Sequence, residues 1–270
     1  MGRYEHIISD MKWSYSRMTA FEFCPYKWFM TYIKKVPKTN MFFSDYGSFM
    51  HSIIEQVLKG ELSREELIPY YMVNYKKEVV GKKPSTKIAQ SYYDQGFSYL
   101  ESFEFPYKPI AVEHHAEFKI GDYAFTGYID CVARDEDGGI IIVDNKSRAL
   151  KPRTTRKKPT KSDAELDDFL RQLYTYAIPV KEIYGEYPKR LEFNCFRTQT
   201  WISEPFIPER LEETKAWAIQ TIQTIAKNDN WPARPEYFKC ANLCEIGGAG
   251  QCEYYDAIKK EIQRSMWKKR

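Results

Sequence analysis

The sequence predicts an α/β fold, and three observations on the order of its elements support this prediction. Three consecutive β-rich runs occupy residues 111–120, 123–135 and 139–147, and glycine-containing turns separate them. A helical pattern then covers 163–184, a further strand covers 190–199, and an amphipathic helix covers 208–228. The stretches on either side of this alternation differ in character, so we expect them to be additions to one α/β core.

The composition is that of a folded domain. The chain has 270 residues, which corresponds to one or two domains and is long enough to bury a core. With 43% hydrophobic residues, 29% charged residues and a net charge of +4, it is not a disordered chain. There is no apolar run of about 18 residues and no secretory signal, so we expect no membrane association and a reducing, cytoplasmic location.

The N-terminal part is predicted to be helical. A first segment at 13–36 begins with Ser16 as its N-cap, and Pro25 breaks and restarts the helix near Cys24. A short amphipathic helix covers 47–60 and closes at Gly60. Residues 62–105 are mostly helical, with an interruption at 81–86.

The remaining elements follow from turn and cap residues. The three β-rich runs are joined by short turns, so we expect antiparallel pairing, and a basic loop follows at 146–161. Ser162 is the expected N-cap of the helix at 163–184, and Pro208 lies in the first turn of the last long helix. Residues 232–256 are cysteine-rich and loop-like, and a short basic tail ends the chain.

Two carboxylates and a lysine form the most informative pattern. Asp130 lies in the second β-rich run, and Asp144 and Lys146 lie at the end of the third. Because alternate side chains of a strand share a face, Asp144 and Lys146 point the same way. Pairing of the two runs brings Asp130 close to Asp144, and two such carboxylates repel unless a cation lies between them. Mg²⁺ and Mn²⁺ prefer these oxygen ligands, and a neighbouring lysine can stabilise charge that develops on a phosphate.

Three further residues accompany this pattern. His51, in the segment Gly47-Ser-Phe-Met-His, can add a metal ligand from a helix. Gln172 and Tyr176 lie one turn apart on one face of the helix that follows the basic loop. Glu113 and Glu117 on the first β-rich run can add an outer carboxylate, but we interpret both as solvated strand residues.

These four motifs, GSFMH, GYIDCV, VDNKS and QLYTY, resemble those of the PD-(D/E)XK nuclease superfamily, and more narrowly the RecB-like exonuclease group. The resemblance covers about residues 12–255. It implies a restriction-endonuclease-like core at about 45–228, with a central mixed sheet flanked by helices, inside a single domain, 1–270. One departure is that Asp144 stands where many relatives have glutamate, which shortens the reach and keeps the charge.

The resemblance also implies a role for each motif residue. One or two Mg²⁺ or Mn²⁺ ions would be held by His51, Asp130, Asp144 and the carbonyl of Asn145. Lys146 would position the attacking water. The catalytic set is completed by residues that contact the DNA backbone or support the site, Gln172 and Tyr176.

The cysteines form a second pattern. Three residues separate Cys240 from Cys244, seven separate Cys244 from Cys252, and Cys24 lies far upstream in a Cys-Pro step. Thiolates at such spacing in a reducing compartment suggest a metal site, and Cys24 is the best fourth ligand. The layout resembles that of iron–sulfur RecB-like nucleases, such as AddB nuclease domains and CRISPR adaptation nucleases. It implies a [4Fe–4S] cluster that joins segments 12–35 and 236–256, although the spacing is wider than in relatives and structural Zn²⁺ is the alternative.

The basic loop is a candidate DNA-binding segment. Eight basic residues and no acid lie between 146 and 161, so the rest of the chain sums to about −4. A solvated charged loop is the simpler interpretation, but the loop connects the strand of Lys146 to the helix of Gln172 and can clamp a phosphate backbone. The candidate contacts beyond Lys146 are Arg148, Lys151, Arg153, Arg156, Lys157, Lys158 and Lys161.

The resemblance implies a metal-dependent DNA exonuclease that acts on single-stranded or end-containing DNA in repair, recombination, or phage or CRISPR DNA processing. The source would be a prokaryotic or phage-infected cell. The alternative is a catalytically inactive nucleic-acid-binding or adaptor subunit of a larger helicase–nuclease complex. The chain has no G-x₄-G-K-[ST] phosphate loop, so a helicase or recombination partner would be a separate chain.

Overall fold

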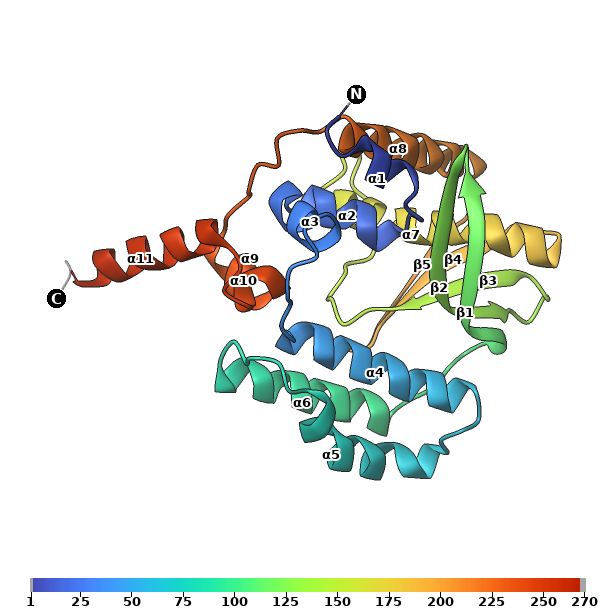
Figure 1. Ribbon diagram of the computed structural model, residues 1–270. Helices are drawn as coiled ribbons and strands as arrows, with labels where there is room; N and C mark the ends of the chain where they lie inside the picture. Colours follow the sequence, from blue (N-terminus) through green and yellow to red (C-terminus); the bar gives the residue numbers. More distant parts are fainter. Residues whose placement is uncertain (1, 268–270) are drawn as a thin grey trace.

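The computed structural model describes residues 2–267 and is built around one five-stranded sheet (Figure 1). The strands follow one another across the sheet in sequence order. All neighbours pair antiparallel except β3 and β4, which are parallel, so the sheet is mixed and the predicted α/β fold is confirmed. The strands are β1 (Lys108–Ile120), β2 (Tyr123–Arg134), β3 (Ile140–Asn145), β4 (Arg190–Cys195) and β5 (Thr200–Pro205).

Helices precede, interrupt and follow the sheet. The parallel pair β3–β4 requires a crossover, which α7 (Lys161–Tyr184) provides. The helices before the sheet are α1 (Glu5–Ser9), α2 (Tyr15–Phe23), α3 (Pro25–Tyr32), α4 (Phe42–Leu58), a 3₁₀ turn (Arg64–Glu66), α5 (Leu67–Glu78) and α6 (Thr86–Glu101). Those after it are α8 (Pro208–Ala226), α9 (Tyr237–Asn242), α10 (Glu245–Gly248) and α11 (Glu253–Trp267).

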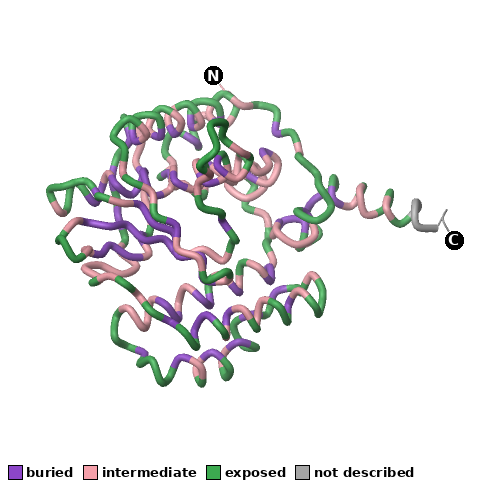
Figure 2. The backbone as a smooth tube through the Cα atoms, turned by 180° about the vertical axis from the view of Figure 1, so that it is seen from behind, coloured by how far each residue is buried: buried purple, intermediate pink, exposed green. Residues whose placement is uncertain are grey.

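The sheet is covered on both faces. Ile140 and Ile142 of β3 belong to a core shared with α7 and α8, whereas Ile141 and Val143 face a smaller cluster that includes Leu58 of α4. A separate aromatic core joins α4, α5 and α6. Every residue of β3 is buried, and in Figure 2 the buried stretches of backbone gather inside the body of the protein. A strand enclosed in this way holds any charged residue at its end in a fixed place.

Two predicted helix caps are wrong. The N-cap of α2 is Ser14, because its extended backbone lets its hydroxyl accept from the Arg17 amide at 3.2 Å, whereas Ser16 lies inside the helix. The N-cap of α7 is Thr160 instead of Ser162, because Thr160 and Asp163 bond each other's backbone amides in a capping box. The restart at Pro25 is confirmed: it is the first residue of α3.

The C-terminal part contains more regular structure than the sequence suggested. The cysteine-rich stretch, expected to be a loop, forms the short helices α9 and α10, and α11 extends from the body of the protein (Figure 1). The last residues of the basic tail, 268–270, lie outside the described residues. Strand β5 was not predicted, and it pairs with β4 at the edge of the sheet. Within 2–267, no helix has both the length and the apolar character needed to cross a membrane.

Candidate active site

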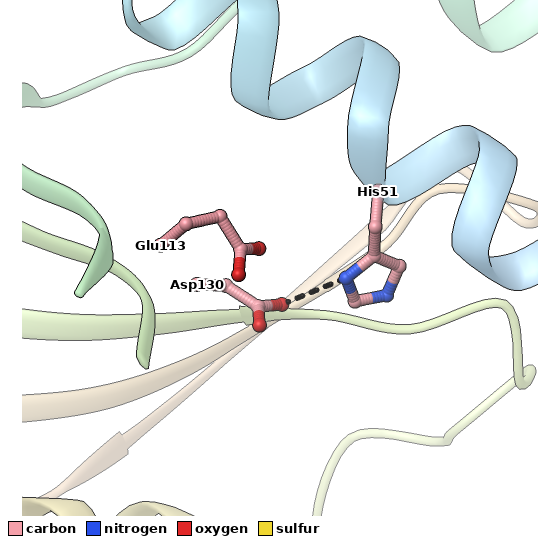
Figure 3. A group of neighbouring side chains, drawn as sticks. All are labelled: His51, Glu113 and Asp130. Atoms are coloured by element: carbon pink, nitrogen blue, oxygen red, sulfur yellow. Dashed lines mark ion pairs between the residues drawn. The ribbon is translucent and has the colours of Figure 1, made fainter. Parts of the chain in front are cut away.

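Three side chains from three elements form a group with the spacing of metal ligands. His51 of α4 approaches Asp130 of β2, with 3.2 Å between Nδ1 and Oδ2 (Figure 3). Glu113 of β1 lies beside them, and one ligand atom from each of the three residues lies within 4.8 Å of the others. A nitrogen and two carboxylate oxygens converging in this way fit a divalent cation.

Glu113 owes its place to strand register. Val112 pairs with Cys131 and His114 pairs with Ile129, so Glu113 lies opposite Asp130. The backbone of Glu113 has φ +49°, in the left-handed region. Its carboxyl is half-buried, and burial, with the charge of Asp130, raises its pKa to about 7. The interpretation of Glu113 as a solvated strand residue is therefore wrong.

Glu117, on the same strand, behaves differently. It is exposed, and its carboxylate pairs with Lys12 at 2.7 Å. The interpretation of Glu117 as a solvated residue is confirmed.

Asp144 and Lys146 form the second part of the site. The Lys146 Nζ lies 2.7 Å from Asp144 Oδ2 and donates to Gln172 Oε1 at 2.8 Å. The amide nitrogen of Gln172 in turn donates to the hydroxyl of Tyr176 at 3.3 Å. The structure thus confirms that each predicted pair shares a face and brings the two pairs together. Asp144 and Gln172 thus hold the Lys146 ammonium from two sides.

The pKa values of Asp144 and Asp130 shift in opposite directions. Burial raises the pKa of Asp144 to about 6, with Lys146 opposing this shift and the charge of Asp130 adding to it. Burial also acts against ionisation of Asp130, but His51 and Lys146 outweigh it and hold the pKa of Asp130 below its usual range. The effect of the Asp130 charge on Asp144 agrees with the expected proximity of the two carboxylates. Neighbouring acids with separated pKa values are typical of functional sites.

Asn145 fixes the position of Asp130. The Asn145 amide donates to Asp130 Oδ2 at 2.7 Å, and its side-chain oxygen accepts from Asn194 of β4 at 2.8 Å. Asn194 also donates to the hydroxyl of Tyr99. Asn145 is therefore held through both its backbone amide and its side chain. Metal ligation by its carbonyl stays a prediction.

Two of the sequence motifs meet in one contact. A Cβ atom added to Gly127 would lie 2.7 Å from a ring carbon of Tyr176 and 3.3 Å from its hydroxyl. Only glycine leaves room for the ring at this point of β2. Gly47, at the start of the histidine motif, has more space, since the nearest atom to an added Cβ is Ser147 Oγ at 3.7 Å.

Comparison with known proteins agrees with this geometry. The sequence profile of the PD-(D/E)XK nuclease superfamily matches residues 12–255, which is most of the chain and includes every site residue above. The chain belongs to the PD-(D/E)XK nuclease superfamily. Members of the superfamily use divalent metals, which accords with the group formed by His51, Glu113 and Asp130. No curated protein sequence matches the chain significantly.

The fold is also found among solved structures. A crystal structure from Eubacterium rectale, described as that of a "putative exonuclease", superposes with a TM-score of 0.52 and 12% identity. The match covers 89% of this nuclease and 91% of the other chain. At this identity the match establishes a shared fold.

Four cysteines of the nuclease come together away from the sheet. Cys24, Cys240, Cys244 and Cys252 are unpaired thiols that line one cavity. The Cys24 sulfur accepts from the amides of Lys27 at 3.5 Å and Arg234 at 3.4 Å, and the Cys244 sulfur accepts from Gly247 at 3.4 Å. The remaining two, Cys131 and Cys195, are fully buried in the sheet, as predicted.

An aromatic residue holds the two cysteine-bearing segments together. Trp231 stacks on Trp28 at 5.2 Å with a 7° angle between the ring planes, and on Phe29 at 5.2 Å with a 19° angle. Trp28 lies in α3, whose N-cap is Cys24, and Trp231 precedes Cys240 in the chain. These contacts fix the chain that returns from α8 to the N-terminal helices.

The basic loop divides into paired and unpaired cations. Arg153 donates to Glu204 at 2.8 Å and to Asp167 at 2.7 Å, so its role here is to hold the loop against α7 and β5. Arg148 pairs with Glu165. In the described part of the chain, five predicted DNA contacts are exposed and make no ion pair: Lys151, Arg156, Lys157, Lys158 and Lys161.

Proposed function

We propose that this chain is a divalent-metal-dependent exonuclease of the RecB-like group that hydrolyses phosphodiester bonds at single-stranded ends of DNA. The observation that carries the proposal is the convergence of His51, Glu113 and Asp130 beside the oriented ammonium of Lys146. The structural neighbour described as a "putative exonuclease" supports the choice of exonuclease.

The site residues have separate roles in hydrolysis. His51, Glu113 and Asp130 fit a divalent cation, and Asp144, which contributes no atom to that group, lies beside it with its charge balanced by Lys146. A bound cation supplies electrostatic stabilisation of the phosphoryl oxygens and of the attacking and leaving groups. Lys146 holds its ammonium where the attacking water and the phosphate meet, and Gln172 keeps it there. Tyr176 in turn positions Gln172.

We also propose that the four cysteines hold a [4Fe–4S] cluster. The donor set fits, because four free thiols line one cavity and backbone amides donate to two of the sulfurs. Tetrahedral zinc, with Zn–S bonds of about 2.3 Å, needs sulfurs about 3.8 Å apart. Among the described residues, no three cysteine sulfurs lie within 4.8 Å of one another, which favours a larger group. A brown protein with the visible absorption of an iron–sulfur cluster is expected; a colourless protein with stoichiometric zinc after anaerobic purification would overturn this.

The activity is tested by digestion of end-labelled DNA in Mg²⁺ and Mn²⁺. Single- and double-stranded substrates with free and blocked ends are compared, and we expect degradation from free single-stranded ends. Asp130→Ala, Asp144→Ala and Lys146→Ala should each abolish it while the circular dichroism spectrum is unchanged. Asp122→Ala and Lys119→Ala, at exposed positions of the β1–β2 hairpin, are the matched controls.

Two results would contradict the proposal. Undiminished degradation by all three site variants would refute the assignment of the site. DNA binding without cleavage in any divalent metal would instead identify the inactive adaptor subunit.

A further inference from the structure

Two open cavities meet on α6, on a part of the surface that no motif points to. The first, of about 680 Å³, lies between α6 and the turn that joins β4 to β5. The second, of about 420 Å³, lies between α5 and α6. Gln90 lines both, so the two cavities adjoin along α6, and we call the two together the α6 groove. The volumes are those of ligand-binding sites.

The α6 groove is positively charged. Its walls carry four cations, Lys76, Lys83, Lys87 and Arg197, and one carboxylate, Asp94. The three lysines are exposed and form no ion pair with any described residue. The carboxylate of Asp94 accepts from the side chain of Gln90 at 2.8 Å. Unpaired lysines along a groove attract a polyanion.

Arg197 links the groove to the active site. Its Nε donates to the carbonyl of Ser147, directly after Lys146, at 2.9 Å. Its Nη1 donates to Gln95 of α6 at 3.1 Å, and its guanidinium lies 4.5 Å from the ring of Tyr92. One wall of the groove is therefore bonded to the residue that follows the active-site lysine in the chain.

The basic loop reaches the same place. Burial raises the pKa of Tyr92, and the charges of both Arg197 and Arg148 act to lower it. Arg148, at the start of the loop, thus lies near Tyr92, the ring that Arg197 of the groove also contacts. A strand held by the loop can continue into the groove.

We infer that the α6 groove binds single-stranded DNA on its way to or from the active site. This inference rests on the proposed nuclease function. The lysines contact the phosphates, and the half-buried ring of Tyr93 in the wall of the second cavity offers a surface for an unpaired base, whereas Tyr75 beside it is buried in the core. A base stacked inside a duplex is not free to reach the ring of Tyr93, so the groove favours a single strand.

The test is the salt dependence of binding for the triple variant Lys76→Ala/Lys83→Ala/Lys87→Ala. Fluorescence anisotropy of a labelled oligothymidylate longer than about 16 nucleotides is measured in EDTA, where no cleavage occurs. Each phosphate contact with a single strand contributes about 0.7 to the slope of log K against log salt, so three lost contacts lower it by about 2. Between about 50 and 200 mM salt, the wild type should then lose about 18-fold more affinity than the variant.

A second triple variant removes the same charge elsewhere. Lys119→Ala/Lys181→Ala/Lys227→Ala changes exposed lysines on β1, at the end of α7 and after α8, and should keep the wild-type slope. The inference is overturned if the groove variant keeps that slope, if the control variant loses as much, or if duplex binding falls equally. A wild type that binds in this way but cleaves nothing would refute the proposed function, while binding of a single strand by the α6 groove would still be supported.

Discussion

Replacement of Gly127 by alanine tests whether the contact between β2 and α7 organises the active site. The added Cβ would lie 2.7 Å from the Tyr176 ring, whereas carbon atoms in contact prefer about 3.5–4.0 Å. The ring must therefore retreat by roughly 1 Å. Overpacking of this kind costs about 1–3 kcal/mol in the free energy of unfolding.

Displacement of the Tyr176 ring should also shift the ammonium of Lys146. Tyr176 accepts from Gln172, and Gln172 accepts from the Lys146 ammonium at 2.8 Å. A misplacement of about 1 Å in a catalytic group can lower the rate about 100-fold. We expect a loss of this size in DNA cleavage by Gly127→Ala, measured under single-turnover conditions beside urea denaturation.

Two further variants make this reasoning refutable. Gly47→Ala, inside α4 where the nearest atom lies at 3.7 Å, should keep the wild-type rate and raise the stability by about 0.5–1 kcal/mol, because alanine favours a helix over glycine. In a Tyr176→Ala background, which has no ring to clash with, Gly127→Ala should add no further cost. If Gly127→Ala destabilises that background as much as the wild type, the contact with Tyr176 is not the cause.

Three more predictions concern other parts of the molecule. Trp231→Ala should lower the free energy of unfolding by about 3–5 kcal/mol in guanidinium denaturation, because a large buried ring is lost. Mn²⁺ affinity, measured by calorimetry, should fall as the pH drops from about 8 to about 6, because protons then compete with the metal for Glu113 and His51. The pKa of Glu113 is about 7, and the charge of Asp130 raises the pKa of His51 against the effect of burial. An unchanged affinity would exclude both residues as ligands. Arg153→Ala should destabilise the fold by about 1–3 kcal/mol, because it leaves Glu204 without its cation and Asp167 with Arg210 alone. Lys157→Ala should instead weaken DNA binding and leave the melting temperature unchanged.

Local periodicity was enough to predict much of the site. Asp144 and Lys146 share a face because alternate residues of a strand do, and Gln172 and Tyr176 share one because they lie a helical turn apart. These relations depend only on the type of element. The structure added that the two pairs meet through the bond between Lys146 and Gln172.

Glu113 was missed because its role depends on pairing between strands. A signal existed: the two-residue turn Gly121-Asp122 joins Ile120 to Tyr123, and counting back along the hairpin places position 113 opposite Asp130. Glu113 was instead interpreted as solvated, because a charged residue in a β-rich run most often faces solvent. Register, once counted, would have brought it into the metal group.

The elements that were not predicted are short ones. Strand β5 has six residues, ends at Pro205 and pairs with one neighbour, so it carries little periodic signal. Helices α9 and α10 are shorter than two full turns. The N-cap Thr160, by contrast, could have been predicted from the sequence, since Thr160 and Asp163 have the spacing of a capping box.

The stacking of Trp231 on Trp28 bears on the order in which the protein matures. The three C-terminal cysteines are more than two hundred residues from Cys24 along the chain, and closing such a loop at a metal would carry a large entropic cost. Because the indole rings already hold the two ends together, that cost is met when the polypeptide folds, before any metal arrives. The metal or cluster that the thiols bind therefore enters a preformed site. Insertion of this group can be a late, separate step of biogenesis, and its loss need not unfold the sheet.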